Sequence, residues 1–412
     1  MRFAMWPRRA TAACLALAGM ALGSAPAEAA PGCRGTHWLG AWSASPAFAQ
    51  DRDLEEVTLR LVVNPTTGGR VARIRLSNRF GARPLRVGAA TIARRAAGAA
   101  LAPGTVRRLR FGGRPAVTVP AGADAVSDPV RLRVRAFRDL AVSVHVRRLT
   151  GGVTYHPFAF QTSYEGAGAH ASDRGGAAFS ETTVAWPLLT GVDVRAPRRA
   201  GALVAFGASS VDGTGSPTDA NHRFTDYLAR RLARRPGPRL SVLNQGIAGN
   251  RLLSDAGSLF GPSLAHRVRA DVLRQSGVSD VIVWLGSGND FRISPSASAS
   301  GVIRGLKALV RRLRRERLNV LLATVSPSAG SIFRAEGGVA ALNAKVRRTN
   351  AWIRSTRLPN ASIDLWKVLH DPARPDFLAR RYDSGDGQHP NSAGYRAVAR
   401  AVRPSLLRGP CA

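Results

Sequence analysis

The sequence predicts two fold classes in one chain of 412 residues. An all-β sandwich or jelly-roll-like domain is expected at residues 34–195, and a three-layer α/β domain with a doubly wound parallel sheet at residues 200–408. Two observations carry this prediction. Short segments that alternate apolar and polar residues fill the first part, and continuous apolar segments alternate with helical ones in the second. The pattern of apolar residues changes near Pro197. A chain of this length fits two or three domains.

The first 29 residues have the pattern of a secretory signal peptide. Three arginines precede an apolar run at residues 10–22, and the small residues AEA at 27–29 form an A-x-A cleavage signal. A membrane anchor is the alternative, but the run is shorter than the ~18 apolar residues that a spanning helix needs. We therefore expect removal of residues 1–29, a secreted protein, and no transmembrane segment in the mature chain.

The cysteines are also consistent with a secreted protein. Cys14 would be removed with the signal peptide, which leaves Cys33 and Cys411 near the two ends of the mature chain. Two cysteines in an exported protein favour a disulfide, and two free thiols are the alternative.

The formal net charge of +34 comes almost entirely from arginine, and the arginines are scattered along the whole chain. Nucleic-acid-binding proteins usually cluster their basic residues with aromatic or glycine motifs, whereas aromatic residues make up only 6% here. We therefore expect no nucleic-acid partner. A chain of this charge fits association with an anionic cell envelope or polysaccharide surface.

In the first part, several segments show the period-two alternation of strands with one buried face. Turn and breaker clusters such as NPTTGG and FGGRP separate them, and no long helical pattern interrupts the series. Short strands at this spacing predict a sandwich or jelly roll. They are expected at residues 57–63, 70–77, 130–136 and 140–148.

In the second part, the strands are continuous apolar runs, as expected for a parallel sheet covered on both faces. Amphipathic segments separate them. Strands are expected at residues 202–206, 240–244, 280–285, 319–325 and 361–366, and helices at residues 221–234, 300–316, 339–356 and 391–407.

Glycines and small polar residues mark four loops of this second part. GASSVDG follows the first strand, QGIAGN the second and GSGND the third, while DGQHPN precedes the last helix. Ligands of open α/β sheets bind at the carboxyl ends of the strands. Four such loops therefore predict a functional site at that edge.

In their order and spacing, these loops resemble the four sequence blocks of the GDSL or SGNH esterases and lipases, and DGQHPNSAGY and NQGIAGNRLL look closest to the carbohydrate-esterase-like branch. The resemblance covers about residues 200–408, and the N-terminal part resembles the all-β accessory domain of some members. It implies a flavodoxin-like sheet, a serine nucleophile and no cofactor. The matching positions are Ser209, Gly249, Asn289, Asp386 and His389.

A serine hydroxyl needs an adjacent base to act as a nucleophile. Of the eight histidines, His389 alone has a motif carboxylate, Asp386, three residues before it. We expect Asp386 to hold one ring nitrogen of His389 while the other accepts the proton of Ser209. The alternative for this pair is a helix N-cap with a chance histidine, and the other histidines are expected to be structural or solvated.

An ester hydrolase also needs donors for the oxyanion of the tetrahedral intermediate. We expect these donors to be the backbone N–H groups of Ser209 and Gly249 and the side-chain amide of Asn289. A turn glycine and an Asx turn are the alternatives at Gly249 and Asn289. No cluster of ligands in the sequence suggests a metal site.

The chain departs from the family pattern at two places. Ala208 stands where the family usually has Asp, and LGSGND carries one residue more than the usual third block, which affects the reach of Asn289. We also expect Asp212 with Gly213 to shape the first loop, and the Ser210 hydroxyl to form a hydrogen bond within it.

These observations predict a secreted carboxylic ester hydrolase that forms an acyl-serine, with short acyl groups, such as acetyl on a polysaccharide, as the expected substrates. A lipase or lysophospholipase of the same family is one alternative. A catalytically weak protein that binds carbohydrate or cell envelope is another.

Overall fold

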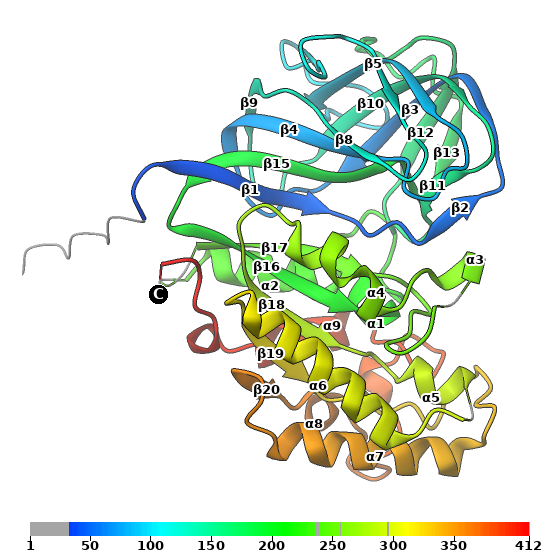
Figure 1. The fold of residues 1–412 in the computed structure, drawn as a ribbon, viewed down its shortest axis with the longest axis vertical. Coiled ribbons are helices and arrows are strands. Elements are labelled where there is room, and N and C mark those ends of the chain that lie inside the picture. Colours follow the sequence, from blue (N-terminus) through cyan, green and yellow to red (C-terminus); the bar gives the residue numbers. More distant parts are fainter. Residues whose placement is uncertain (1–32, 236, 238, 256, 295, 412) are drawn as a thin grey trace, which may run out of the picture.

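The structure, a computed structural model, describes residues 33–411 except 236, 238, 256 and 295. The expected signal peptide at residues 1–29 lies outside the described residues. Figure 1 shows an antiparallel region, formed by strands β1 to β15, stacked on a parallel region that begins with β16.

The antiparallel region contains two larger sheets and a small one. Their strand orders are β1-β15-β4-β8 with β9 beside β4, β13-β12-β3-β10-β5-β6 with β7 beside β5, and β14-β11-β2. The strands are β1 (Thr36–Ser43), β2 (Phe48–Gln50), β3 (Leu54–Val63), β4 (Gly69–Ser77), β5 (Leu85–Arg94), β6 (Arg107–Arg108), β7 (Val117–Val119), β8 (Asp124–Val126), β9 (Val130–Val134), β10 (Leu140–Leu149), β11 (Val153–His156), β12 (Ser163–Ala167), β13 (Glu181–Thr183), β14 (Trp186–Pro187) and β15 (Leu189–Pro197).

One apolar core lies between the two larger sheets. Ile74 of β4 and Val192 of β15 meet Leu61 of β3 and Val144 of β10 there, and all four are fully buried. The four segments predicted from alternation correspond to β3, β4, β9 and β10. The antiparallel sandwich is therefore confirmed.

The parallel sheet has the strand order β17-β16-β18-β19-β20, which is the doubly wound order of flavodoxin-like folds. Its strands are β16 (Ala200–Gly207), β17 (Arg239–Gly246), β18 (Val278–Trp284), β19 (Asn319–Ala323) and β20 (Ala361–Ile363). The helices are α1 (Ser209–Asp212), α2 (Phe224–Ala233), α3 (Gly257–Phe260), α4 (Leu264–Val268), the π-helical turn η2 (Arg269–Leu273), α5 (Asn289–Ile293), α6 (Ala299–Arg315), α7 (Val339–Ser355), α8 (Leu365–Leu369), α9 (Ser392–Ala401), and the short 3-10 turns η3 (Arg380–Tyr382) and η4 (Pro404–Leu406).

Both faces of this sheet are covered, which gives the predicted three layers. Val204 and Phe206 of β16 pack in one apolar core with α4, α6 and α7, whereas Leu203 and Ala205 pack in another with α2, α8 and α9. Successive side chains of a strand point to opposite faces, so each strand of a sheet covered on both sides reads as a continuous apolar run.

Two predicted elements end at least three residues earlier than expected. The strand predicted at residues 361–366 stops at Ile363, because the side chain of Asp364 accepts a hydrogen bond from the Lys367 N–H and caps α8. The helix predicted at residues 391–407 is α9, which ends at Ala401 and is followed by η4.

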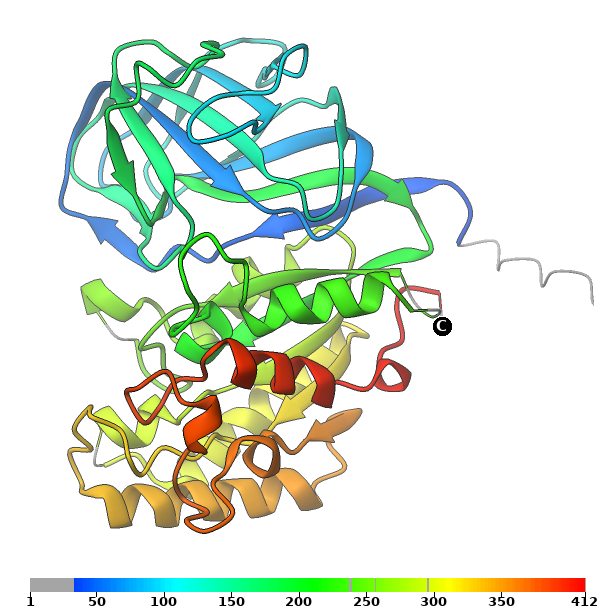
Figure 2. The same cartoon turned by 180° about the vertical axis from the view of Figure 1, so that it is seen from behind.

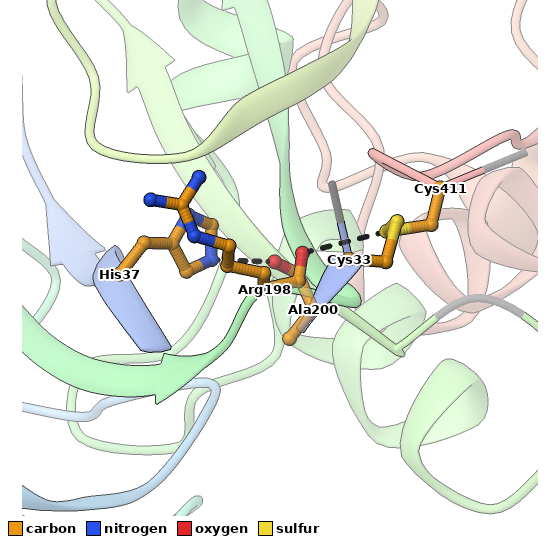
Figure 3. The surroundings of a disulfide bond; sticks show 5 residues. All are labelled: Cys33, His37, Arg198, Ala200 and Cys411. Atoms are coloured by element: carbon orange, nitrogen blue, oxygen red, sulfur yellow. Dashed lines mark hydrogen bonds between the residues drawn. A yellow bond between two sulfur atoms is a disulfide. The ribbon is translucent and has the colours of Figure 1, made fainter. Parts of the chain in front are cut away.

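The two regions are joined without a linker. Only Arg198 and Arg199 separate β15 from β16. Figure 3 shows the Cys33–Cys411 disulfide beside this connection, where the Cys411 Sγ lies 3.7 Å from the carbonyl oxygen of Arg198. The expected disulfide is therefore present, and it joins the two ends of the described chain at the amino-terminal end of β16.

The antiparallel region also covers the edge strand of the parallel sheet. At β17 the N–H of Val242 donates to the hydroxyl oxygen of Thr66 over 3.0 Å, and the Thr66 hydroxyl lies 3.1 Å from the Val242 carbonyl. Leu39 of β1 packs in the same core as Leu243 of β17. An edge strand that would otherwise present unpaired backbone groups is thus protected within the chain.

Candidate active site

Ser209 is the first residue of α1, directly after β16 at the carboxyl edge of the sheet. The turn needs glycine at position 207, because a Cβ there would lie 1.9 Å from the carbonyl oxygen of Trp284. The chain can therefore leave β16 against the end of β18. This close approach places the Ser209 side chain at the carboxyl edge, as the sequence predicts.

The structure brings Ser209, His389 and Asp386 together. The Ser209 Oγ lies 2.8 Å from the Nε2 of His389, and the His389 Nδ1 lies 2.6 Å from a carboxylate oxygen of Asp386. Since the carboxylate can only accept, Nδ1 carries the proton and Nε2 is free to accept the serine proton. Ser209 and His389 are both 4% exposed. This arrangement has the geometry of a serine nucleophile with its base and orienting acid.

Asp386 is held as an anion. Burial raises the pKa of its carboxyl group, but hydrogen bonds from the His389 ring, the His389 N–H and the Gln388 N–H outweigh burial and lower the pKa to about 2. The carboxylate therefore remains an acceptor for the histidine ring throughout the neutral pH range.

Ser210 points elsewhere. Its side chain is fully buried and faces Gly286, where a Cβ would lie 3.0 Å from the Ser210 Oγ. Among the described residues, this hydroxyl has no hydrogen-bond partner. The loop hydrogen bond expected for Ser210 is therefore absent there, and Ser209 is the serine that contacts the histidine.

The loop after β17 holds Gly249 in a left-handed conformation, with φ of +71°. A side chain at this position would also meet the Phe260 ring at 2.2 Å, so glycine satisfies both the backbone and the packing. Within the described part of the chain, the Gly249 N–H has no hydrogen-bond acceptor. It is free to bind an anion.

The additional residue in LGSGND is accommodated by two glycines. Gly286 and Gly288 both have left-handed backbones, with φ of +62° and +80°, and Asn289 then begins α5. The Asn289 side-chain amide donates to the carbonyl oxygen of Asn250 over 3.0 Å. Asn289 therefore reaches the loop that carries Gly249, and one of its two amide protons is not used in this bond.

Two charged residues that the sequence reasoning did not single out hold these loops in place. The buried guanidinium of Arg267 donates to the carbonyl oxygens of Gly207 and Gln245 and to the side chain of Asn250, over 2.7, 2.9 and 3.0 Å. Asp290 accepts hydrogen bonds from the backbone N–H groups of Leu252 and Leu253. Neither belongs to a motif that marks a positioning role, although Asp290 follows Asn289 directly.

Asp212 connects the site to the antiparallel region. One of its carboxylate oxygens accepts the Ala248 N–H over 2.9 Å, directly before Gly249. The other lies 3.2 Å from the Nε2 of His156, the last residue of β11, without hydrogen-bond alignment. The Nδ1 of His156 lies 2.7 Å from the Ser45 carbonyl, and both members of the pair are almost fully buried.

This contact changes the interpretation of His156. The sequence placed it among structural or solvated histidines, and it is a buried histidine beneath the loops that carry Ser209 and Gly249. Burial lowers the pKa of its imidazole, but the charge of Asp212 and hydrogen bonds to neighbouring acceptors, such as the Ser45 carbonyl, together outweigh burial and raise the pKa overall. Asp212 and Gly213 shape the first loop, since Gly213 ends α1 with a left-handed backbone, and Asp212 also carries this cross-region contact.

Among the described residues, no group of three His, Cys, Asp or Glu side chains is placed to hold a metal ion. In the same part of the chain, no helix is both long enough and apolar enough to cross a membrane.

The parallel region matches a known protein family. Residues 205–397 match the profile of the GDSL-like Lipase/Acylhydrolase family. The matched segment begins in β16 and ends within α9, so it includes Ser209, Gly249, Asn289, Asp386 and His389. A comparison with curated proteins found no match.

Solved structures similar to this chain cover about half of it. The aryl esterase of M. smegmatis is 22% identical over 50% of this chain and 100% of its own, with a TM-score of 0.40. A carbohydrate acetylesterase from Sinorhizobium meliloti is 16% identical over 49% and 96%, with a TM-score of 0.39. A lipase/acylhydrolase from Enterococcus faecalis is 18% identical over 51% and 98%, with a TM-score of 0.40. Residues 205–397 therefore form a GDSL-like lipase/acylhydrolase domain, and the protein is a carboxylic ester hydrolase.

Proposed function

We propose that the protein hydrolyses carboxylic esters through an acyl-serine intermediate on Ser209. The observation that carries this proposal is the chain of two short contacts, Ser209 Oγ to His389 Nε2 at 2.8 Å and His389 Nδ1 to Asp386 at 2.6 Å. The Ser209 Oγ attacks the ester carbonyl while His389 takes its proton. The protonated ring then delivers that proton to the departing alcohol. A water molecule, deprotonated by His389, attacks the acyl-serine and releases the carboxylic acid.

The negative charge of each tetrahedral intermediate would be stabilised by three donors. These are the backbone N–H groups of Ser209 and Gly249 and the unused side-chain proton of Asn289. Support comes from the free Gly249 N–H and from the bond that holds Asn289 to Asn250, next to Gly249. Fixed donors of this kind stabilise developing charge without reorganising during the reaction.

For the substrate, we propose a short acyl group, such as an acetyl ester on a polysaccharide. The packing of Phe260 against Gly249 supports this proposal, because the ring fills the space directly beside the proposed oxyanion donor. The Gln388 amide, 3.3 Å from the His389 Nε2, also narrows the approach to Ser209.

One observation favours the alternative, a lipase with longer acyl chains. Phe333 lies edge-on to the His389 ring, with the ring centroids 6.0 Å apart. Its neighbour Ile332 donates its N–H to the carbonyl oxygen of Asp386. Ile332 is 73% exposed and Phe333 47%, so apolar surface lies beside the base. Such surface suits an acyl chain.

A chain-length series separates these substrates. Initial rates are measured on p-nitrophenyl acetate, butyrate, octanoate and palmitate, and on acetylated xylan. We expect the highest kcat/KM for acetate or butyrate and release of acetate from the polymer. A maximum at octanoate or palmitate would assign the site to lipids instead, and no turnover of any ester would indicate a catalytically inactive binding protein.

We also propose that the protein is exported. The signal-like residues 1–29 and the Cys33–Cys411 disulfide support this, because structural disulfides persist in oxidising compartments. Expression in a secreting host followed by N-terminal sequencing of the product tests it. We expect the mature protein in the medium to begin at Ala30; a product that retains Met1 in the cytoplasm would contradict export.

A further inference from the structure

A second feature lies on the face of the parallel sheet covered by α2 and α9. Figure 2 shows these two helices side by side. A surface depression of about 630 Å³ lies between them, and none of the described residues that line it carries a carboxylate. Its lining includes His222, Tyr227 and six arginines: Arg230, Arg231, Arg234, Arg235, Arg396 and Arg400. We call this feature the α2–α9 groove.

The arginines of the groove are poorly compensated. Asp226, the acidic residue of α2, is already engaged, because its carboxylate is paired with Arg223 at 3.1 Å. The side chains of Arg234, Arg235 and Arg400 form no hydrogen bond or ion pair with any described residue. Burial and the charges of Arg235 and Arg400 lower the pKa of Arg231, and burial and the charge of Arg230 lower that of His222. These cations repel one another, and a bound polyanion would relieve the repulsion.

The spacing of the cations suits a chain-like ligand. Arg230 and Arg234 are four residues apart, as are Arg396 and Arg400, so each pair is separated by about 6 Å along its helix. Like charges at this spacing destabilise a helix. A linear ligand with regularly repeated anionic groups could therefore bind along the groove, and the guanidinium fork matches a carboxylate.

Two other polyanions fit the groove less well. Among the described residues, none of the exposed large apolar side chains lies on α2 or α9, so nothing there would insert into a bilayer. The ring of Tyr227 is already engaged by His222, stacked at 5.2 Å, and by Arg230 and Arg396 at 4.9 and 5.2 Å. It is therefore not available to stack on a nucleic-acid base.

We propose that the α2–α9 groove binds an acidic polysaccharide with repeated carboxylates. One end of the groove lies close to the catalytic loop. The Nδ1 of His222 is 3.1 Å from the Oγ of Ser392, which begins α9 three residues after His389. A polymer in the groove would be held beside Ser209. This last step rests on the proposed esterase function, whereas the binding itself does not.

The test is titration calorimetry of the purified protein with de-esterified oligogalacturonate at about 0.05 M and about 0.5 M NaCl. The groove variant is Arg234→Gln/Arg235→Gln/Arg400→Gln. The matched control removes the same charge from α6, on the opposite face of the sheet, as Arg311→Gln/Arg312→Gln/Arg315→Gln. Thermal unfolding checks that both variants fold.

We expect salt-sensitive binding that weakens about tenfold in the groove variant, the summed effect of three exposed ion pairs. The α6 control should differ from the wild type by less than about twofold, since screening limits distant charges. Equal weakening in both variants, or no binding by the wild type, would overturn the proposal. So would a larger loss for anionic vesicles or a single-stranded oligonucleotide than for oligogalacturonate.

A kinetic measurement connects the groove to the reaction. On acetylated polygalacturonate, we expect the groove variant to have a KM about tenfold above that of the α6 control, in line with the binding loss. If the wild type binds oligogalacturonate but does not hydrolyse p-nitrophenyl acetate, the proposed function fails and the groove stands. An equal KM in both variants, with binding lost, would show that the groove does not deliver substrate.

Discussion

The two regions of the chain contribute to the site in different ways. The parallel region carries Ser209, His389 and Asp386, all in loops at the carboxyl edge of its sheet. The antiparallel region contacts these loops and the sheet that carries them. His156 lies against Asp212, and Thr66 covers the edge of β17. Under the proposed mechanism, the parallel region supplies the reacting groups and the antiparallel region positions the loops that carry them. Substitutions in the two regions should therefore have effects on kcat and on stability that differ in size and in kind.

The largest effect is expected from the base in the parallel region. His389→Ala removes the group that accepts the serine proton, so kcat should fall by at least about 10⁴-fold. The measurement is the steady-state rate on p-nitrophenyl acetate. His370→Ala is the matched control, since the one hydrogen bond of the His370 ring to a described residue is to the Lys367 carbonyl. A His389→Ala variant with more than a few per cent of the wild-type rate would contradict the assignment.

A smaller effect is expected at the proposed oxyanion donors. Asn289→Ala should lower kcat by about 10²-fold, as the loss of one donor commonly does. KM should change little, because the amide acts on charge that develops in the transition state. An unchanged kcat would mean that Asn289 only stabilises the loop of Gly249 through its hydrogen bond to Asn250.

The antiparallel region is tested by His156→Ala. This change leaves Asp212 buried without its imidazole neighbour, so the Ala248 and Gly249 segment should be less well held. We expect kcat to fall about tenfold with KM nearly unchanged, since a small misplacement of catalytic groups is costly. His156→Gln, which keeps a donor, should recover part of the loss.

His145→Ala provides the control for this experiment. His145 is also buried in the antiparallel region, but its ring contacts Glu56 instead of a catalytic loop. It should lower the stability without lowering kcat in the folded protein. If both variants lose kcat equally, His156 has only a general structural role.

The smallest effect on catalysis is expected from the disulfide. Cys33 and Cys411 lie at the amino-terminal end of β16, the full length of this strand away from Ser209. Cys33→Ser/Cys411→Ser should lower the free energy of unfolding by up to about 5 kcal/mol in the chain-entropy account. Denaturant unfolding measures this change, and kcat should stay within about twofold of the wild type. A large loss of kcat in the folded variant would show that the two edges of the sheet are coupled.

Much of the site could be predicted from sequence because it follows local rules. Parallel strands are continuous apolar runs, and their carboxyl ends share one edge, so Ser209, Gly249 and Asn289 could be placed at one edge. The Asp386 and His389 pair is only three residues apart. Ala208 did not disrupt this geometry, since the Ser209 and His389 contact forms with alanine at that position.

The remaining features depend on contacts between distant segments. Arg267 reaches Gly207 across 60 residues, and His156 reaches Asp212 from another sheet. No sequence motif distinguishes either residue from the other arginines and histidines of the chain. The early end of β20 arose because Asp364 caps a helix there, a local signal that was outweighed by the apolar run. Tertiary packing decided the positions of Arg267 and His156, whereas a local helix cap decided the end of β20.

The most direct test of the central claim is to map the covalent adduct of a fluorophosphonate probe. The reagent phosphonylates an activated serine, and mass spectrometry of the digested protein identifies which of the adjacent serines is modified. We expect the label on Ser209, no label after Ser209→Ala, and substantial labelling and turnover after Ser210→Ala, because only the Ser209 hydroxyl contacts His389. A label on Ser210, or full esterase activity in Ser209→Ala, would contradict the account.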